Sequence, residues 1–163
     1  MIRAAVLTVS DKGFAGLRVD QSGPAIVHAL SALGIEATVQ MILPDERVQI
    51  AAQLRAWALQ EQFDLVLTTG GTGAAPRDWT PEATRDVIER EMPGLAELLR
   101  IEGARKTPVA VLSRGIAGLC GQCLIINLPG SPKAVREGME ILSVVLPHAL
   151  QMARGENLEH GSA

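Results

Sequence analysis

A glycine-rich stretch, TTGGTG from Thr68 to Gly73, is the first candidate for chemistry. Glycine has no Cβ atom, so Gly70, Gly71 and Gly73 would let the backbone approach a phosphate group and direct N–H groups at it. The stretch is not a Walker A loop, since no Gly-Lys-Ser/Thr follows it. Pro76 stands where the dinucleotide fingerprint would require its last glycine. Taken alone, the stretch fits a plain tight turn equally well.

Two charged residues follow these glycines. Arg77 could pair with a phosphate through its planar guanidinium group. Asp78 would repel a phosphate unless a cation lay between them, and Mg²⁺ binds proteins through one or two carboxylates together with phosphate oxygens. The pair therefore indicates a magnesium–phosphate site or, as the alternative, an Arg–Asp ion pair on a solvated loop. Glu82 is interpreted only as a favourable partner for the dipole of the next helix.

A second candidate is Asn127–Lys133, where a strand, a turn and a helix start follow one another. Ser131 could cap this helix, and Lys133 lies nearby, an arrangement that offers N–H groups to an anion. An ordinary capped turn is the alternative. A third stretch, Thr8–Gly13 with Arg18–Pro24, places hydroxyls and charges after the first predicted strand. By itself this third stretch is typical of a surface loop.

The composition limits the class of protein. The chain has 163 residues, about the length of one domain, and 47% of them are hydrophobic, which excludes a disordered chain. The formal charge of −3 argues against a nucleic-acid binder. No apolar run reaches the roughly 18 residues of a membrane span. The N-terminal residues lack the features of a signal peptide, so we expect a cytoplasmic protein.

The two cysteines, Cys120 and Cys123, form a C-x-x-C pair. A zinc site needs about four ligands, and the three histidines offer no matching spacing. A thioredoxin-like pair would open a helix after a strand, whereas Cys123 enters an apolar strand-like run. We therefore expect two reduced cysteines without a metal, in a loop and at a strand edge.

Strand-like and helix-like runs alternate along the chain, with no linker or repeat between them. Ser22 and Asp45 are each expected to cap the helix that they begin, and the later helices start with an early proline. Pro147 is expected to kink the last helix. The run Glu36–Ile42 alternates in polarity and should lie near a sheet edge. The other predicted strands are Ile2–Val9, Asp64–Thr68, Val109–Leu112 and Leu124–Asn127, and the predicted helices begin near Ser22, Asp45, Thr80, Pro93 and Ser131.

This alternation predicts a three-layer α/β/α domain with a mostly parallel sheet. We expect a single domain over residues 1–155 and a short tail over residues 156–163. Ligands of such folds bind beyond the carboxyl ends of the strands. The three polar or glycine-rich stretches each follow a predicted strand, so they should meet at one edge of the sheet.

In this order, the motifs resemble the Mog/MoaB family, which includes the G domain of gephyrin. The resemblance runs from Ile2 to about Gly155, and the joint order of the motifs is more specific than any one of them. The matching pieces are TVSD (Thr8–Asp11), RVDQSGP (Arg18–Pro24), PDE (Pro44–Glu46), TTGGTG (Thr68–Gly73), RDWTPEAT (Arg77–Thr84), LSR (Leu112–Arg114) and INLPGSPKAV (Ile126–Val135).

The resemblance implies a molybdopterin adenylyltransferase, which joins AMP from ATP to molybdopterin and releases pyrophosphate. It also implies a homotrimer and transient contact with a molybdenum-inserting protein. The acidic residues of the family fall on Asp45 and Asp78, which are the expected catalytic residues and ligands of Mg²⁺. The expected substrate-binding residues are Ser10, Asp11, Gly70, Gly71, Thr72, Gly73, Arg77, Pro129, Gly130, Ser131 and Lys133.

Two other functions stay open at this point. One is a non-catalytic molybdopterin-binding or scaffold protein of the MoaB branch, which would have no need for both Asp45 and Asp78. The other is a nucleotide pyrophosphatase, because the fold resembles a domain of the competence-damage-inducible family. Hydrolysis of a nucleotide without molybdopterin would favour this last function.

Overall fold

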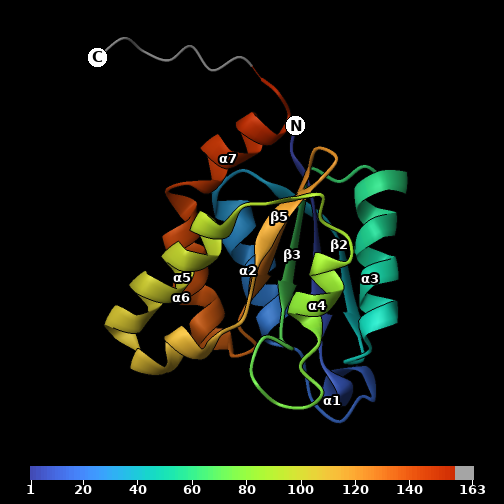
Figure 1. Ribbon diagram of the computed structural model, residues 1–163, viewed down its shortest axis with the longest axis vertical. Coiled ribbons are helices and arrows are strands. Elements are labelled where there is room, and N and C mark those ends of the chain that lie inside the picture. Colours follow the sequence, from blue (N-terminus) through green and yellow to red (C-terminus); the bar gives the residue numbers. More distant parts are fainter. Residues whose placement is uncertain (157–163) are drawn as a thin grey trace.

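A six-stranded sheet forms the centre of the computed structural model, which describes residues 1–156. The strand order is β2-β1-β3-β6-β5-β4; the first four of these strands are parallel, and β5 and β4 extend the sheet in antiparallel fashion. This confirms the predicted mostly parallel sheet (Figure 1). The strands are β1 (Arg3–Val9), β2 (Glu36–Leu43), β3 (Leu65–Thr69), β4 (Arg90–Glu91), β5 (Ala117–Cys120) and β6 (Cys123–Leu128).

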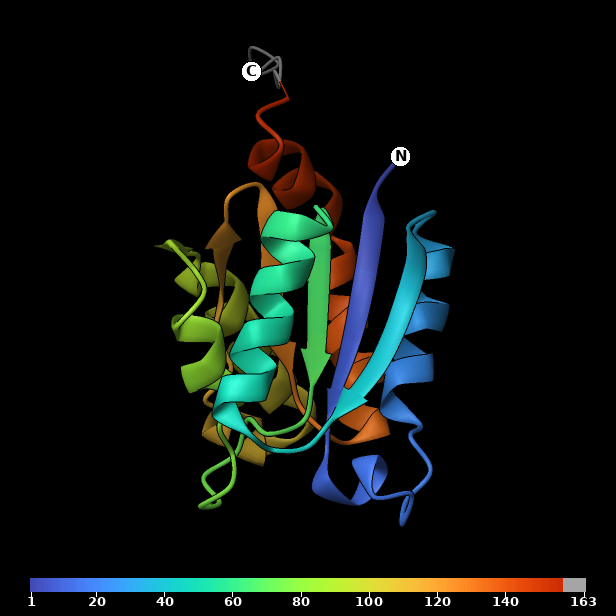
Figure 2. The same ribbon diagram turned by 90° about the vertical axis from the view of Figure 1, so that its right-hand side faces the viewer.

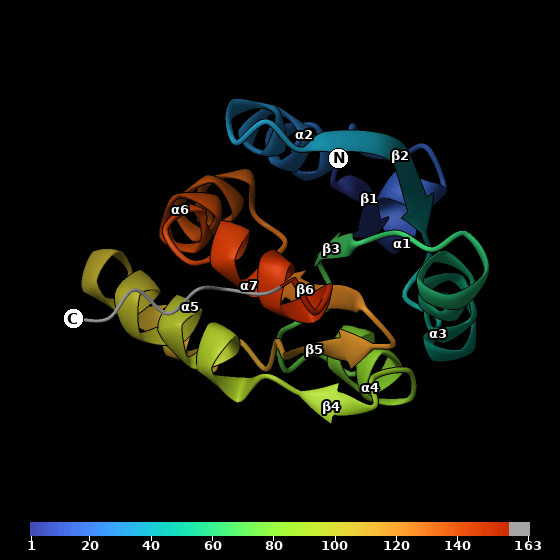
Figure 3. The same ribbon diagram turned by 90° about the horizontal axis from the view of Figure 1, so that it is seen from above.

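Helices cover both faces of the sheet and complete the three predicted layers (Figure 3). One face packs against α2, α5, α6 and α7, and the other against α3, η1 and α4. Within residues 1–156, no helix is both long and apolar enough to cross a membrane. The helices are α1 (Asp11–Phe14), α2 (Ser22–Ala32), α3 (Arg47–Arg55), the π-helix η1 (Ala56–Gln60), α4 (Thr80–Arg85), α5 (Pro93–Lys106), the 3₁₀-helix η2 (Pro108–Leu112), α6 (Pro132–Ser143) and α7 (Leu146–Ala153).

The inner strands are apolar on both sides because each side faces a helical layer. In β1, Ala4 and Val6 contact the core that includes α2 and α6, whereas Ala5 and Leu7 contact the core that includes α3. The alternating run predicted for an edge is β2, and β2 does lie at one edge of the sheet. Figure 2 shows β1, β2 and β3 ending at the same edge, next to α1.

One predicted strand is wrong, and two strands were not predicted. Val109–Leu112 belongs to the 3₁₀-helix η2, where Val109 is 65% exposed and Leu112 is 66% exposed. Pro108 removes a backbone donor at its start, and the apolar side chains face solvent instead of a core. The place beside β6 is taken by β5, which a two-residue hairpin turn through Gly121 (φ 58°) joins to β6.

Most predicted helix starts are confirmed, since α4, α5 and α6 each begin with a proline in the first turn. Ser131 caps α6 by accepting a hydrogen bond from the N–H of Ala134. The last helix is interrupted rather than kinked, and Pro147 lies in the first turn of α7. The prediction that Asp45 caps α3 is wrong, because α3 begins at Arg47 without a side-chain cap. The boundary at 155 stays a prediction, and residues 157–163 of the predicted tail lie outside the described residues.

The prediction that Ser22 caps α2 is also wrong. Asp20 Oδ1 accepts the N–H groups of Ser22 and Gly23 at 3.0 and 3.1 Å. The hydroxyl of Ser22 instead donates to the carbonyl oxygen of Gly130 at 2.8 Å. The side chain of Ser22 therefore joins α2 to the turn that follows β6.

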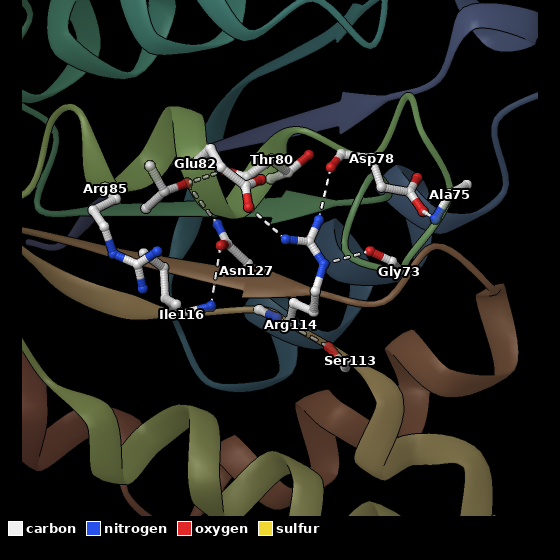
Figure 4. A network of polar contacts seen from close by, with 12 residues as sticks. Gly73, Ala75, Asp78, Thr80, Glu82, Arg85, Ser113, Arg114, Ile116 and Asn127 are labelled. Atoms are coloured by element: carbon white, nitrogen blue, oxygen red, sulfur yellow. Dashed lines mark hydrogen bonds and ion pairs between the residues drawn. The ribbon is translucent and has the colours of Figure 1, made fainter.

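A buried amide joins the elements beneath the carboxyl edge of the sheet. Asn127 Nδ2 donates to Thr68 Oγ1 at 3.0 Å and to Thr84 Oγ1 at 2.9 Å, and its Oδ1 accepts the N–H of Ile116 at 3.1 Å (Figure 4). Both threonine side chains are fully buried. One side chain thus connects β6 to β3, to α4 and to the segment before β5.

Replacing Asn127 with Leu should destabilise the fold by about 2–4 kcal/mol, because buried hydroxyl and N–H groups lose their partner. Urea unfolding measures this free energy. The control is Gln151→Leu, in the exposed part of α7, which should change stability by less than about 0.5 kcal/mol. Equal stabilities of the two variants would show that the amide has no structural role.

Candidate active site

The three predicted stretches meet at the carboxyl ends of β1, β3 and β6 and surround a hollow of about 720 Å³. We call it the carboxylate hollow because Asp20, Asp45 and Asp78 contribute to its wall. The expected convergence at one sheet edge is therefore confirmed. The lining residues are Thr8, Val9, Ser10, Gly13, Arg18, Val19, Asp20, Gln21, Ser22, Asp45, Thr69, Gly70, Gly71, Asp78, Gly130, Ser131 and Pro132.

The first two loop glycines are required by backbone geometry. Gly70 has a φ of 95° and Gly71 a φ of 65°, a region that residues with a Cβ atom rarely adopt. A Cβ atom on Gly70 would overlap the carbonyl oxygen of Val9, and one on Gly71 would overlap Thr80 Oγ1. Thr80 Oγ1 donates to the carbonyl oxygen of Gly70 at 2.8 Å, which fixes the turn. Gly73 has no positive φ, but a Cβ atom there would lie 2.8 Å from Asp78 Oδ2.

The turn after β6 packs directly against this glycine loop. Thr69 Oγ1 donates to the carbonyl oxygen of Pro129 at 2.7 Å. A Cβ atom on Gly130 would lie 3.3 Å from Gly70 Cα, so the two backbones are in close contact. The two candidate phosphate-binding stretches therefore form one continuous surface.

Five backbone N–H groups on this surface donate no hydrogen bond within residues 1–156. A concave group of unpaired N–H donors beside a helix N-terminus is a binding site for a phosphate group. This arrangement favours the phosphate interpretation of both stretches over that of plain turns. The N–H groups belong to Gly71, Thr72, Gly73, Gly130 and Ser131.

Asp45 lies half-buried in the wall of the hollow. Its Oδ2 accepts the N–H of Asp11 at 2.9 Å, and Asp11 Oδ1 in turn accepts the N–H of Asp45 at 3.0 Å. Burial raises the pKa of Asp45 above its ordinary value, and the charges of Asp11 and Asp78 add to this rise. The hollow therefore concentrates negative charge that a cation would stabilise.

The donor atoms fit Mg²⁺. Asp78 Oδ2 accepts the N–H of Ala75 at 2.9 Å, while the Oδ1 atoms of Asp45 and Asp78 accept no hydrogen bond from residues 1–156. The same residues contain no group of three or more His, Cys, Asp or Glu side chains that could hold a metal ion by themselves. Two carboxylates that leave further positions to phosphate oxygens suit the coordination that Mg²⁺ adopts with nucleotides.

Arg77 and Lys133 do not line the carboxylate hollow. Arg77 Nε and Nη2 donate to the carboxylate of Asp11 at 2.6 and 3.0 Å, and Nη2 also donates to Glu46 Oε1 at 2.9 Å. This contact lowers the pKa of Asp11. Arg77 therefore joins its loop to α1 and to the start of α3, and its fork is directed at carboxylates.

Arg18, rather than Arg77 or Lys133, contributes a positive charge to the carboxylate hollow. Of the described residues that line the carboxylate hollow, it is the one with a positive side chain. The sequence placed Arg18 in a surface loop, although it opens the RVDQSGP motif. That motif was the signal that could have identified it. Asp20, in the same motif, accepts a hydrogen bond from Thr8 Oγ1 at 2.6 Å and so joins this loop to the end of β1.

A second, apolar hollow of about 560 Å³ lies on the other side of the Gly130–Ser131 turn. Its walls come from α5, η2 and α6 and from the outer face of the glycine loop, and Lys133 lies in its rim. Sequence patterns did not indicate this hollow, because η2 was predicted as a strand. Its lining includes Thr72, Gly73, Leu99, Arg100, Val109, Leu112, Ser113, Asn127, Pro129, Gly130, Ser131, Lys133 and Ile141.

Cys120 and Cys123 are buried free thiols that face each other across the hairpin between β5 and β6. Burial raises the pKa of Cys123 to about 12. Since β6 starts at Cys123 and reaches the hollows after Leu128, the thiols lie at the opposite end of the strand.

The family of the chain follows from comparison with known proteins. Residues 5–148 match the family described as "Probable molybdopterin binding domain". The chain belongs to this family.

Three known proteins of this kind are similar to the chain. The chain is 40% identical, over 160 residues, to the molybdopterin adenylyltransferase of Helicobacter pylori, covering 97% of the chain and 91% of the relative. The chain also resembles the crystal structure of the molybdopterin biosynthesis enzyme MoaB from Thermus thermophilus, with a TM-score of 0.91 and 55% sequence identity. The match covers 95% of the chain and 98% of that structure. The Drosophila melanogaster molybdenum cofactor synthesis protein cinnamon is 43% identical over 152 residues, but the match spans 25% of its length.

Asp45→Asn should raise the melting temperature at neutral pH by roughly 1–4 °C. Because the pKa of Asp45 is raised, its charged form destabilises the fold at every pH above that raised value. This penalty disappears as the pH falls below the ordinary pKa of an aspartate, so the difference between variant and wild type should shrink in acid. Calorimetry from neutral pH down to about pH 3, below the ordinary pKa of an aspartate, measures this difference in melting temperature.

The matched control is Asp86→Asn, because hydrogen bonds from Arg47 at 2.8 Å lower the pKa of Asp86. The stability that Asp86 contributes is present above the ordinary pKa of an aspartate and is lost in acid. Asp86→Asn should therefore lower the melting temperature at neutral pH, opposite to the effect of Asp45→Asn. A less stable Asp45→Asn variant at neutral pH would show that burial does not dominate at this carboxylate.

Proposed function

We propose that this protein is a molybdopterin adenylyltransferase. An oxygen of molybdopterin attacks the α-phosphorus of ATP; the new P–O bond forms as the bond to the β-phosphate breaks, and pyrophosphate leaves. The observation that carries the proposal is the presence of Asp45 and Asp78 in the same hollow as the unpaired N–H groups of Gly71, Gly130 and Ser131. The near full-length similarity to the Helicobacter pylori adenylyltransferase supports it.

The residues of the hollow suit nucleotidyl transfer, which depends mainly on positioning and charge stabilisation. Asp45 and Asp78 would hold Mg²⁺, which neutralises phosphate charge when bound. The N–H groups of Gly71, Gly130 and Ser131 orient phosphate oxygens, and Arg18 offsets charge that develops on the leaving pyrophosphate. Neither a nucleophilic side chain nor a redox group is needed.

The two hollows suit a reaction between two substrates that each carry a ring and a phosphate. They share the turn at Gly130 and Ser131, so phosphates lying over this turn can react while the rings occupy separate spaces. A metal ion held by Asp45 and Asp78 would neutralise the phosphates on the side of the carboxylates, and the apolar hollow accepts a planar ring.

The resemblance to the Mog/MoaB family supports further parts of the proposal. These are a homotrimeric assembly, Mg²⁺ as the metal, a cytoplasmic location and transient contact with a molybdenum-inserting protein. A pure molybdopterin binder is less well supported, since it would require neither of the two carboxylates at the phosphate surface.

The test is the formation of adenylyl-molybdopterin and pyrophosphate from ATP, Mg²⁺ and molybdopterin, followed by chromatography. Asp78→Asn should lower kcat by about 100- to 10,000-fold, because it removes a charge that holds the metal. Binding of molybdopterin should stay within about threefold, since its ring does not require that carboxylate. Removal of Mg²⁺ with EDTA should stop the wild-type reaction.

Asp86→Asn is again the control, because Asp86 pairs with Arg47 outside both hollows. Its kcat should equal that of the wild type. A wild type that binds molybdopterin without turnover would identify a binder, and ATP hydrolysis without molybdopterin would identify a pyrophosphatase. Normal turnover by Asp78→Asn would contradict the role of Asp78.

A further inference from the structure

Arg114 makes four hydrogen bonds to the segment from Thr72 to Glu82, which runs from the end of the glycine loop into α4. Figure 4 shows the three that its guanidinium group makes. Its backbone N–H donates to the carbonyl oxygen of Thr72 at 2.8 Å. Its Nε and Nη2 donate to the carbonyl oxygens of Gly73 and Asp78, each at 2.7 Å, and its Nη1 pairs with the carboxylate of Glu82. A single residue therefore contacts both ends of the loop that carries Asp78.

This loop has little packing of its own. Residues 74–78 are largely exposed, so buried apolar contacts cannot fix them. Their ties to the rest of the protein are polar. Arg77 holds the outer side of the loop to Asp11 and Glu46, and Arg114 holds the inner side.

The closure made by Arg114 determines where the Asp78 carboxylate lies. Bonds to the carbonyl oxygens of Gly73 and Asp78 keep the two ends of the loop together. Within the closed loop, Asp78 Oδ2 accepts the N–H of Ala75 at 2.9 Å, and the carboxylate turns back over Gly73. Opening the loop would move the carboxylate away from Asp45.

Arg114 is itself held firmly. Arg100 Nη1 donates to the carbonyl oxygens of Ser113 and Gly115 at 3.3 and 2.8 Å, on either side of Arg114. Glu82 faces the guanidinium from the first turn of α4, and its Oε2 is shielded from solvent without a partner in residues 1–156. Arg114 is thus the charge that compensates this carboxylate.

We propose that Arg114 is a positioning residue for adenylyl transfer, which holds the Asp78 loop so that both carboxylates face the phosphate surface. The inference rests on the proposed function. Arg114 lies between Ser113 and Gly115, which line the apolar hollow, and it bonds to the loop that borders the carboxylate hollow. It therefore fixes the relative position of the two hollows.

Four variants separate positioning from simple stabilisation. Arg114→Gln removes the guanidinium, and Arg114→Lys keeps the charge beside Glu82 without the fork that reaches both carbonyl oxygens. The double variant Glu82→Gln, Arg114→Gln also removes the Glu82 carboxylate, which would otherwise lose its charged partner. The control is Arg3→Gln. Arg3 lies at the start of β1, away from both hollows, and its guanidinium donates to the carbonyl oxygen of Glu61 at 3.0 Å.

Arg114→Gln should lower kcat by about 100-fold, a loss typical of misplacing a catalytic group by about 1 Å. The KM for molybdopterin should stay within about threefold, whereas half-saturation by Mg²⁺ in the presence of ATP should need about tenfold more metal. Hydrogen exchange at the amide of Ala75 should become at least about tenfold faster, because that amide depends on loop closure. Arg3→Gln should leave all of these values unchanged.

The double variant should recover stability without recovering kcat, and Arg114→Lys should keep stability with a lowered kcat. In the Asp78→Asn background, loss of Arg114 should cost less than about threefold, because both changes act on one carboxylate. Full activity in Arg114→Gln, recovery of kcat with stability, or unchanged Ala75 exchange would overturn the inference. A wild type without adenylylation would refute the proposed function instead, and the exchange measurement would still decide whether Arg114 closes the loop.

Discussion

The close contact between Gly70 and Gly130 is the constraint on which the rest of the site depends. The two turns pack against each other without intervening side chains. They are 60 residues apart in sequence, and a hydrogen bond from Thr69 to Pro129 joins them. This contact places the unpaired N–H groups of both turns on one surface. The buried amide of Asn127 holds the strands beneath it in register, so the surface is formed before any ligand arrives.

Charge is distributed unevenly over this rigid base. N–H donors form the floor, while Asp45 and Asp78 lie in loops above it. The positive charges of Arg77 and Arg114 hold loops in place, and Arg18 is left to face the hollow. The chain carries a formal charge of −3, so local placement rather than net charge makes the site suitable for anions.

The sequence predicted the parallel strands well, because apolar runs such as Leu65–Leu67 are stable only where both faces of the strand are buried. It failed for Val109–Leu112, since an apolar run does not reveal that its side chains will face solvent. It also left the partner of Arg77 open. The partner of Arg77 lies 66 residues away, and local sequence cannot distinguish a phosphate from a distant carboxylate as the partner of a guanidinium group.

The hairpin through Gly121 and Gln122 has a practical consequence for engineering. It opens β6 at the end of the sheet opposite the hollows, and Gln122 is exposed. Lengthening a hairpin tip costs little conformational entropy, and exposed tips tolerate inserted sequence. A fluorescent label or an affinity peptide placed between these two residues would therefore report on the protein without obstructing either substrate.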